Sequence, residues 1–411
     1  MKKKAIVLGG TMPHLHLIRK LKNRGYETIL IDYFDNPPAK SEADRHIKES
    51  TLDKEAVLNI ALKENADLVI SACVDQANAT ACYVSEKLGL PHPYSYETAL
   101  NVTNKRRMKK ILIQNEIPTS DFRIIDPGDS VEKIKGLEFP LIVKPTDANS
   151  SKGVFVVNDE NEYCERIKRS LEISRENKAI VEQFVSGTEI QVDCFAINGK
   201  SHVLMVKDHI VGIEKGREIK PSGFVSPGPA CSAHMEQIEE VASKIATAFN
   251  LDTVPFFYQA ICNENGVFVF ELAARSAGGT SFSSVGIRSG IDYLDLALDA
   301  FMQKKVTLKV NPNPQKFTAC FLHMKPGTFD RVEGIDELME DGTIDYFYPF
   351  IVSGQKIGPE NVWGNCVAAV MVLSETYEEG NEKVKKVLNY VKLLNDKHED
   401  MSIWKKDLRG N

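Results

Sequence analysis

Short β-branched runs alternate with amphipathic helical stretches over residues 4–93, and this alternation constrains the fold more than any other feature of the chain. The strand-like runs are Ala5–Leu8, Thr28–Ile31 and Leu68–Ser71, and the helical stretches lie near residues 13–24, 53–65 and 75–88. Strands that alternate with helices in this way form parallel sheets with helices on both faces. Leu88-Gly89-Leu90-Pro91 ends the last helix, because Gly supplies a left-handed cap and Pro prevents continuation. We therefore predict a doubly wound parallel sheet and a domain boundary near residue 94.

Further α+β units are predicted along the rest of the chain. Strand-like runs lie at 122–125, 141–144, 154–157, 179–185, 189–197, 201–208, 255–262, 267–274, 317–324 and 366–373. Helical stretches lie at 104–115, 130–135, 159–173, 232–249, 291–303 and 379–394. Residues 212–230, rich in Gly, Pro, Ser and charges, are predicted to form a long loop. We divide the chain into an N-terminal sheet domain (1–94), a second domain (95–305) with a small mobile lid at about 118–185, and a C-terminal α+β unit (306–411).

Composition and charge limit the partners of the chain. It has 51 basic and 57 acidic residues, a formal net charge of −6 and 43% hydrophobic residues, which is typical of a globular protein. Dense basic tracts are short, so neither a nucleic acid nor a membrane surface is an expected partner. No apolar run is long enough to span a membrane, and Ala5–Leu8 is too short for a signal peptide. The eight cysteines are scattered without a CxxC pair, and we expect a cytoplasmic protein that binds a small anion.

A glycine turn after the first strand imitates a dinucleotide-binding fingerprint. Gly9-Gly10 follows the strand, and Asp32 ends the next strand about twenty residues on. The full GxGxxG is absent, and His14-Leu15 occupies the stretch where the third glycine belongs. We therefore favour an ordinary glycine turn over a nicotinamide-dependent dehydrogenase. His14 and His16 lack a further metal ligand nearby and are interpreted as ordinary loop and helix-start histidines.

Lys144 and the loop of small residues that follows it are suited to binding phosphate. Lys144 ends the buried strand Leu141–Lys144, where a solvated lysine would normally be avoided. In the loop Asn149–Gly153, backbone N–H groups and the hydroxyls of Ser150 and Ser151 can turn toward phosphate oxygens. Most loops of this composition are simple turns, so the lysine and the loop support the prediction only together.

Residues 180–189 have the pattern of a nucleotide-binding hinge. The strand Ile180–Val185 leads into Gly187, and irregular backbone at this point offers hydrogen-bond donors and acceptors to an adenine edge. Glu189 is then placed to hold a ribose. Taken alone, either Glu182 or Glu189 is better explained as a surface charge.

The hairpin that turns at residues 264–266 brings a carboxylate opposite an amide. If the turn is a three-residue loop that ends on a left-handed glycine, residues 263 and 267 pair, and Gln259 faces Glu271. An amide oxygen and a carboxylate can share magnesium with substrate phosphates, because Mg²⁺ gives up its water reluctantly. The hairpin therefore predicts the metal end of the site.

Arg275 follows Glu271 by four residues and presents a planar fork of donors to a transferring phosphoryl group or a substrate carboxylate. The small residues of Ser276–Thr280 let backbone N–H groups approach an anion. A buried Glu–Arg ion pair is the competing structural explanation, and it is disfavoured because the upstream elements occur in the right order.

In this order, the elements resemble those of the ATP-grasp superfamily over about residues 1–305. The shared elements are the glycine-turn domain, Lys105, Lys144, the loop with Ser150, Ser151 and Gly153, Glu182–Val185, Glu189, Gln259, Glu271 and Arg275. One departure is Ala273, which stands where many members have Asn in Glu-x-Asn-x-Arg. This departure leaves the number of magnesium ions open.

The resemblance implies a pre-ATP-grasp domain over 1–94, an ATP-grasp domain over 95–305 and a contact for each residue. The implied contacts are those of Lys105, Lys144 and the loop residues Ser150, Ser151 and Gly153 with ATP phosphates, Glu182 and Val185 with adenine, Glu189 with ribose, Gln259 and Glu271 with magnesium, and Arg275 with the reacting groups. ATP and Mg²⁺ are therefore the expected cofactors.

The activity that the resemblance implies is phosphoryl transfer from ATP to a carboxylate, followed by attack of an amine on the acylphosphate to give an amide, ADP and phosphate. Such transfer needs positioning and charge neutralisation rather than a protein nucleophile. The expected partners are a small-molecule carboxylate and an amine, with amino acids among them because residues 306–411 look similar to the C-terminal unit of L-amino acid ligases.

Three alternatives stay open: a purine-pathway ligase, a bicarbonate-activating enzyme resembling part of carbamoyl-phosphate synthase, and a non-catalytic nucleotide sensor, which Ala273 alone supports. The substrates are not determined by the sequence, nor is the oligomeric state, for which a homodimer is considered. Within the loop 212–230, the charges of Lys215, Arg217 and Lys220 either recognise a substrate carboxylate or phosphate, or are simply solvated.

Overall fold

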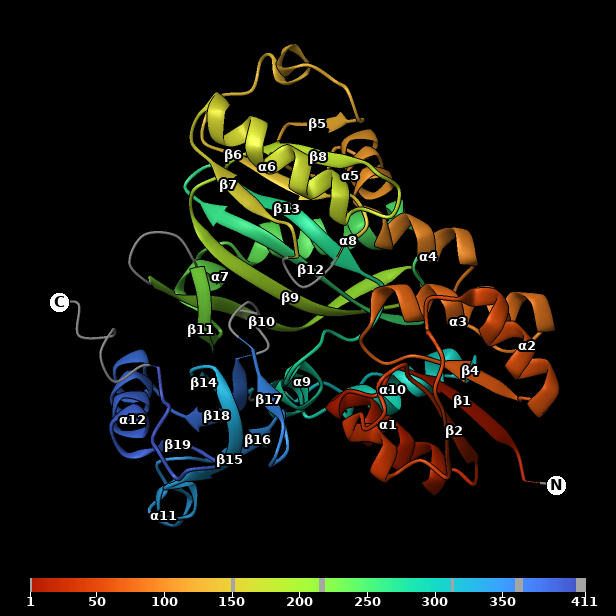
Figure 1. Ribbon diagram of the computed structural model, residues 1–411, viewed down its shortest axis with the longest axis vertical. Coiled ribbons are helices and arrows are strands. Elements are labelled where there is room, and N and C mark those ends of the chain that lie inside the picture. Colours follow the sequence, from red (N-terminus) through yellow and green to blue (C-terminus); the bar gives the residue numbers. More distant parts are fainter. Residues whose placement is uncertain (1, 149–151, 214–218, 312–313, 359–364, 404–411) are drawn as a thin grey trace.

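The computed structural model describes residues 2–148, 152–213, 219–311, 314–358 and 365–403. Their strands form four sheets. In Figure 1 the N-terminal sheet lies at the lower right, a small sheet lies at the top, and a long sheet coloured green to blue runs between the two regions toward the C-terminal part. This arrangement confirms the mixed α/β fold class.

The N-terminal sheet is parallel, with the strand order β3-β2-β1-β4. Its elements are β1 (Lys4–Leu8), α1 (Met12–Asn23), β2 (Glu27–Ile31), a 3₁₀ turn (Pro38–Ser41), β3 (Arg45–Ile47), α2 (Lys54–Glu64), β4 (Leu68–Ile70) and α3 (Asp75–Leu88). Gly89 caps α3 with a φ of 65°, as its sequence context predicts. The short strand β3 was not expected, because three residues that begin with Arg and His lack the apolar run that marks the others.

The crevice at the carboxyl ends of β1 and β4 is filled by the side chain of His14. A Cβ on Gly9, whose φ is 102°, would lie 2.8 Å from the imidazole ring. The N–H of Ala72 donates to Nε2 at 3.3 Å, and Nδ1 lies 2.8 Å from the hydroxyl of Thr11. The glycine turn therefore makes room for the protein's own histidine, which supports the sequence interpretation against a dinucleotide site.

We expect His14 to make the folded state sensitive to acid. Burial, and secondarily Arg275, lowers the pKa of His14 from 6.5 to about 3. Between these values the unfolded chain binds the proton and the folded chain does not, so stability falls as the pH falls, by up to about 1.4 kcal/mol per pH unit. Urea unfolding of the wild type and His14→Gln between pH 7 and 4 measures this contribution. Parallel pH dependences in the two proteins would contradict it.

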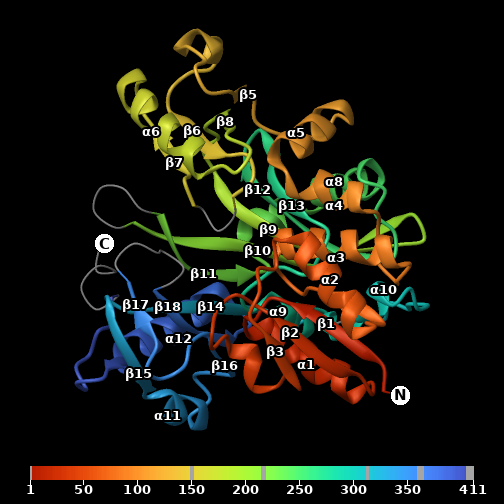
Figure 2. The ribbon, with the colours of Figure 1, turned by 45° about the vertical axis from the view of Figure 1, so that its right-hand side comes forward.

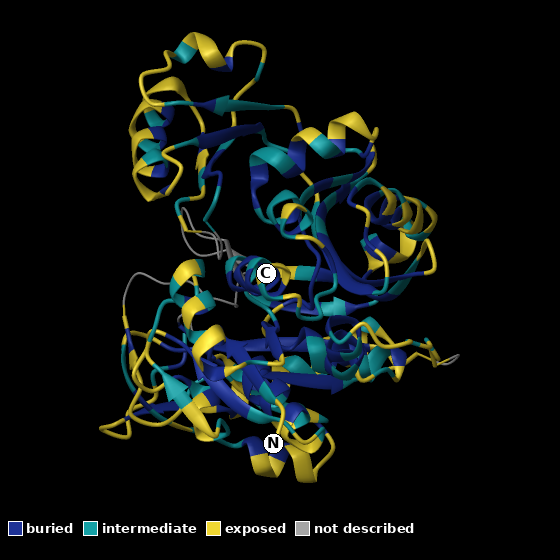
Figure 3. Ribbon diagram, turned by 90° about the vertical axis from the view of Figure 1, so that its right-hand side faces the viewer, coloured by how far each residue is buried: buried dark blue, intermediate teal, exposed yellow. Residues whose placement is uncertain are grey.

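A four-stranded sheet in the order β5-β8-β6-β7 forms the upper part of Figure 1. The elements from α4 to β8 are α4 (Tyr96–Thr103), α5 (Lys105–Gln114), β5 (Phe122–Ile125), a 3₁₀ turn (Val131–Ile134), β6 (Leu141–Pro145), β7 (Phe155–Val157), α6 (Glu160–Ile173) and β8 (Ala179–Gln183). The helix expected at 130–135 is thus a 3₁₀ turn, and the strand expected to reach Val185 ends at Gln183. Figure 3 shows this sheet standing apart from the buried strands below it.

The central sheet has eight strands in the order β13-β12-β9-β10-β11-β14-β18-β16. Its strands are β9 (Thr188–Ile197), β10 (Lys200–Ile213), β11 (Ile219–Ser226), β12 (Val254–Asn263), β13 (Gly266–Ala273), β14 (Phe317–His323), β16 (Tyr346–Pro349) and β18 (Cys366–Leu373). Helices α7 (Pro229–Ala233), α8 (Met235–Ala248), α9 (Ser281–Ser289) and α10 (Tyr293–Phe301) accompany it. Apolar residues of β9 and β12 pack with α8 in the largest core cluster.

The expectation of a long loop over 212–230 is wrong. Strand β10 continues to Ile213, and β11 pairs with β10 on one side and β14 on the other. The sequence of β11 resembles a loop because it contains Gly223, and a Cβ there would lie only 2.0 Å from the carbonyl oxygen of Ala319. The glycine is thus required by close strand packing. Lys215 and Arg217 lie outside the described residues.

The C-terminal part adds a three-stranded sheet in the order β17-β15-β19. Its elements are β15 (Gly327–Glu333), α11 (Ile335–Glu340), β17 (Lys356–Ile357), α12 (Tyr377–Tyr390) and β19 (Lys392–Asn395). The helix expected at 379–394 therefore ends at Tyr390, and its last residues form β19. Among the described residues, no helix has the length and apolarity that crossing a membrane requires.

Candidate active site

Three buried charges meet where the upper sheet approaches α5. The Nζ atom of Lys144 on β6 lies 2.6 Å from Oε1 of Glu182 on β8, and the Nζ atom of Lys109 on α5 lies 2.9 Å from Oε2. Strand pairing fixes Ile142 opposite Glu182, which places Lys144 diagonally across from the carboxylate. The structure thus places Glu182, expected at the adenine, between two ammonium groups.

The electrostatics of this cluster favour its charged form. Burial alone would raise the pKa of Glu182, but the two lysines outweigh it and lower the pKa to about 2. Burial lowers the pKa of Lys109 to about 8, against the opposing effect of Glu182. The hydroxyl of Ser120 also donates to Glu182, at 2.9 Å. The cluster therefore holds a net positive charge inside the protein.

Lys109 was not singled out by the sequence analysis, although its side chain is 0% exposed. It lies on α5, one turn after Lys105, and its neighbours Met108 and Leu112 are buried. A lysine next to the apolar face of a predicted helix is the signal that could have identified it. Its Nζ also donates to Thr119 Oγ1 at 2.6 Å.

Lys105 occupies the first position of α5, where Asn104 caps the helix by accepting from the N–H groups of Arg106 and Arg107. Its Nζ donates to the carbonyl oxygen of Ala148 at 2.7 Å. The structure therefore brings Lys105 to the start of the predicted phosphate-binding loop.

The loop itself is described only at its ends. Ser150 and Ser151 lie outside the described residues. Gly153 has a φ of 73°, and a Cβ there would lie 2.9 Å from Pro145 and from Ile173. Packing against β6 and α6 thus accounts for this glycine, and a phosphate contact at Gly153 stays a prediction.

Val185 lies in the connection between β8 and β9, beyond the end of the upper sheet. The connection is held to β12, since the amide of Asn263 donates to the carbonyl oxygen of Ser186 at 2.7 Å. Gly187 has a φ of 149°, and a Cβ there would lie 2.5 Å from the carbonyl oxygen of Cys262. The expected hinge is thus a close crossing over β12, and the adenine contact of Val185 remains untested.

Gln259 and Glu271 are directly opposed on β12 and β13, as expected. The route to that pairing differs from the prediction, because Asn263 pairs with Gly266 rather than with residue 267. A β-bulge between Gln259 and Ala260 shifts the register by one residue and restores the predicted opposition. The pair was therefore correct although the turn was wrong.

Glu189 on β9 joins this pair at the same face of the sheet. The amide of Gln259 donates to Glu189 Oε1 at 3.4 Å. Burial, and then the Glu271 carboxylate, raises the pKa of Glu189 to about 7. Within the described ranges, neither Glu189 nor Glu271 has a basic side chain within 4.0 Å. Two carboxylates that repel each other without a paired cation are a donor set that suits a divalent metal ion.

A closed protein cage for a metal is absent from the described part of the chain, which holds no group of three or more His, Cys, Asp or Glu side chains suited to an ion. Mg²⁺ does not require one, since it commonly binds one or two carboxylates together with water and substrate phosphates. The directly opposed donors Glu271 and Gln259 fit that pattern, and Glu189 lies beside them.

Arg275 is buried and paired with Asp75 of α3. Its Nε and Nη2 atoms donate to the two carboxylate oxygens, each at 2.6 Å, and Nη1 donates to the carbonyl oxygen of Ser276 at 2.8 Å. The sequence analysis expected this fork to face a transferring phosphoryl group or carboxylate. The structure instead commits one side of the guanidinium to a residue 200 positions away, and leaves two N–H groups for another ligand.

Replacing Asp75 by Asn is expected to lower the unfolding free energy by about 1.5–3 kcal/mol, because the amide keeps the shape of the side chain but loses the charge that Arg275 pairs with. Urea denaturation measures the change. Asp396→Asn is the matched control, since this exposed carboxylate makes no hydrogen bond or ion pair with a described side chain. Equal losses in the two variants would contradict a stabilising role for the pair.

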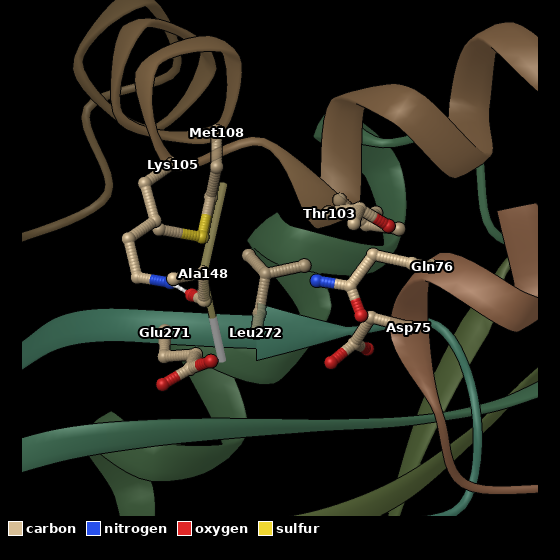
Figure 4. A pocket seen from close by; sticks show the side chains of 9 residues that line it. Asp75, Gln76, Thr103, Lys105, Met108, Ala148, Glu271 and Leu272 are labelled. Carbon is tan, nitrogen blue, oxygen red and sulfur yellow. Dashed lines mark hydrogen bonds between the residues drawn. The ribbon is translucent and has the colours of Figure 1, made fainter. Parts of the chain in front are cut away.

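A small pocket lies between Lys105 and the proposed metal donor Glu271 (Figure 4). Its lining residues are Asp75, Gln76, Val102, Thr103, Lys105, Met108, Ala148, Glu271 and Leu272. In the figure, the Glu271 carboxylate lies below Lys105, and Asp75 and Gln76 enter from α3. Helix α3 thus contributes two side chains to the pocket, Asp75 and Gln76, which the sequence analysis did not single out.

A family model matches the middle of the chain. Residues 137–284 match the model of the ATP-grasp domain family. That range contains Lys144, Glu182, Glu189, the Gln259–Glu271 pair and Arg275. This stretch of the chain therefore matches an ATP-grasp domain, as the sequence resemblance indicates.

Three curated relatives are similar to this chain. The formate-dependent phosphoribosylglycinamide formyltransferase of Sulfurisphaera tokodaii is 28% identical over 44% of this chain and 47% of its own length. The carbamoyl phosphate synthase large chain of Pyrococcus furiosus is 24% identical over 72% of this chain and 28% of its own length. The matches thus span half or less of these two proteins. The L-arginine-specific L-amino acid ligase of Bacillus subtilis is 23% identical over 71% of both chains.

Two solved structures share the fold. The L-amino acid ligase of Bacillus licheniformis has a TM-score of 0.80 at 19% identity, covering 96% of this chain and 99% of its own. The biotin carboxylase domain dimer of Hydrogenobacter thermophilus 2-oxoglutarate carboxylase, in complex with MgADP, ADP and bicarbonate, has a TM-score of 0.76 at 15% identity, covering 96% and 91%. Both matches extend over the N-terminal, ATP-grasp and C-terminal parts of the chain.

Proposed function

We propose that this chain is an ATP-dependent ligase that joins a small-molecule carboxylate to an amine. One observation carries the proposal: Glu189, Gln259 and Glu271 share one face of the central sheet, neither carboxylate is paired with a cation among the described residues, and Lys105 lines a pocket with Glu271. Acidic metal donors beside buried ammonium groups match the needs of phosphoryl transfer, which are positioning and neutralisation of phosphate charge.

In this proposal each site residue contacts a particular part of MgATP or of the reacting groups. Lys105 and Lys144 neutralise ATP phosphates, Glu189 holds the ribose, and Glu182 and Val185 line the adenine end. Glu271 and Gln259 hold Mg²⁺, which supplies neutralisation of the charge on the phosphate oxygens. The two N–H groups that Asp75 and Ser276 leave on Arg275 donate to the reacting oxygens.

The proposed reaction has two steps. An oxygen of the acid attacks the γ-phosphorus of ATP, so that an acylphosphate forms and ADP leaves. The nitrogen of the amine then attacks the acyl carbon, the carbon–oxygen bond to phosphate breaks, and an amide and inorganic phosphate are released. L-amino acids are the favoured substrates, because an L-amino acid ligase matches this chain over 96% of its length. A homodimer is the proposed assembly, as for the carboxylase domain described above.

The test is release of ADP and phosphate across a matrix of acids and amines with MgATP. We expect release only when a suitable acid is present, and amide formation only when the amine is added. The acids include formate and bicarbonate as well as amino acids, because a formate-dependent formyltransferase is among the relatives. Tight binding of MgATP without release in any combination would favour the nucleotide-sensor alternative, which Ala273 supports.

A further inference from the structure

A row of polar side chains crosses four strands of the central sheet at one level. Strand pairing sets Lys207 on β10 opposite Gln191 on β9, Gln191 opposite Gln259 on β12, and Gln259 opposite Glu271 on β13. Directly opposed residues in antiparallel strands point to the same face. Neighbouring strands lie roughly 4.8 Å apart, so the backbone positions of Lys207 and Glu271 are roughly 14 Å apart.

This face of the sheet is the one that carries the proposed metal donors. The intervening residues of β9 and β12, such as Val192 and Tyr258, point to the opposite face and belong to the core that contains α8. In Figure 2, β9 and β10 run side by side through the centre of the molecule, with α9 below them. Lys207 therefore lies at the far end of the same surface from Glu271.

Lys207 is a buried cation whose hydrogen bonding is incomplete. It is 4% exposed, its Nζ lies 3.2 Å from the hydroxyl of Ser281, and the ring centroid of Phe224 is 4.4 Å away. Over the residues that the structure describes, no carboxylate oxygen lies within 4.0 Å of this ammonium group. An ammonium group has three N–H donors, and burying them without acceptors is costly.

His209 lies two residues further along β10, on the same face. Its Nε2 atom is buried and has no hydrogen-bond partner in the described part of the chain. Its ring lies near Phe224, with the centroids 6.4 Å apart. Two nitrogen atoms with unused bonding capacity thus lie side by side at this end of the row.

The start of α9 adds positive potential at the same place. Ser281, which contacts Lys207, is the first residue of this nine-residue helix. The N-terminus of a helix carries a partial positive charge that favours anions. The N–H groups of Ser281 and Ser283 already donate to the carbonyl oxygens of Gly278 and Thr280, so α9 contributes its dipole rather than these donors. A cation, an imidazole and a helix N-terminus therefore converge on one small region.

We propose that Lys207, His209 and the start of α9 form the subsite that binds the carboxylate of the acid substrate. This inference rests on the proposed function. It assigns one end of the row to the ATP phosphates and the other end to the acid substrate. The phosphates of MgATP lie over Glu271 and Gln259, and the acid lies between them and Lys207. Gln191, in the middle of the row, lies beneath the reacting groups.

The competing explanation makes Lys207 a structural counter-charge for Asp193, which is 0% exposed. Asp193, however, accepts from the amide of Gln191 at 2.9 and 3.1 Å, and neither of its carboxylate oxygens lies within 4.0 Å of the Lys207 ammonium group. A counter-charge role also leaves the bare Nε2 atom of His209 without a purpose. The carboxylate subsite accounts for both features.

The test measures binding of small carboxylic acids to the protein loaded with the magnesium complex of the non-hydrolysable ATP analogue AMPPNP, by titration calorimetry. The acids are formate, acetate, bicarbonate and the L-amino acids. We expect Lys207→Met and His209→Phe to weaken binding of the acid by about 10- to 100-fold and to leave the affinity for the nucleotide unchanged. Lys200→Met is the matched control, since Lys200 is exposed at the other end of β10.

The result that overturns the inference is equal acid affinity in the wild type and both variants, or no acid bound by the wild type. Turnover is measured separately. If an acid binds through Lys207 but releases no ADP, the proposed function fails and the subsite stands. If ADP is released with an unchanged KM for the acid in both variants, the function stands and the subsite is wrong. If circular dichroism shows that Lys207→Met does not fold, the affinity of His209→Phe for the acid tests the subsite instead.

Discussion

Replacing Glu271 by Gln is expected to lower the rate of ADP release by about 10²–10³-fold, because the substitution removes the charge with which β13 neutralises a metal ion on the phosphates. The side chain keeps nearly its size, so the hairpin and the opposition to Gln259 should persist. Steady-state kinetics at saturating MgATP and acid measure the change. The expected pattern is a large fall in kcat with a smaller change in the KM for ATP.

The control for this variant is Glu264→Gln in the turn of the same hairpin. Glu264 is exposed, and its side chain makes no hydrogen bond or ion pair with a described residue. It should therefore retain wild-type kinetics. Raised magnesium concentration should partly restore activity to Glu271→Gln, because a weakened metal site is filled by mass action. Wild-type kcat in Glu271→Gln would remove the metal assignment.

Replacing Glu182 by Gln is expected to lower the unfolding free energy by about 3–5 kcal/mol, because it leaves the ammonium groups of Lys109 and Lys144 buried without their counter-charge. Glu172→Gln on the exposed side of α6 is the matched control. Urea denaturation measures the difference in unfolding free energy between each variant and the wild type. Unchanged stability would show that water, rather than Glu182, compensates the lysines.

Two further measurements sharpen this prediction. The loss in Lys109→Met/Glu182→Gln should be smaller than the sum of the single losses, because the double variant removes a cation together with the anion. The pKa of Glu182 is lowered to about 2 from 4.5, so its contribution is fully present above pH 4.5 and is lost as the pH falls through about 2. A contribution that disappears already near pH 5 would contradict the cluster's geometry.

The parts of the fold that could be predicted are those whose sequence has a clear period. The alternating elements of residues 4–93 follow from apolar runs and helical spacing, and α3 with its Gly89 cap lies where expected. Strand β11 could not be predicted, because Gly223 is required by close packing against the carbonyl oxygen of Ala319 in β14, about a hundred positions away. Local sequence carries no record of such a neighbour.

The same distinction applies to the candidate site. The opposition of Gln259 and Glu271 was predicted because both belong to one short hairpin, although the turn has a different register and a β-bulge beside Gln259 restores the pairing. The partners that complete the site are remote. Asp75 reaches Arg275 across 200 positions, and Lys109 reaches Glu182 from another element. Pairs of this kind depend on how separate elements pack, which no single motif encodes.

The central sheet continues without a break across the boundary expected at residue 305, and this limits how the molecule can be divided. Strand β11 bonds to β10 through one edge and to β14 through the other. A chain that ended before β14 would leave the second edge of β11 with its N–H and C=O groups bare, ready to pair with another copy. The family match at 137–284 thus marks a stretch of sequence, whereas we expect a separately produced fragment to stay monodisperse only if it includes β14.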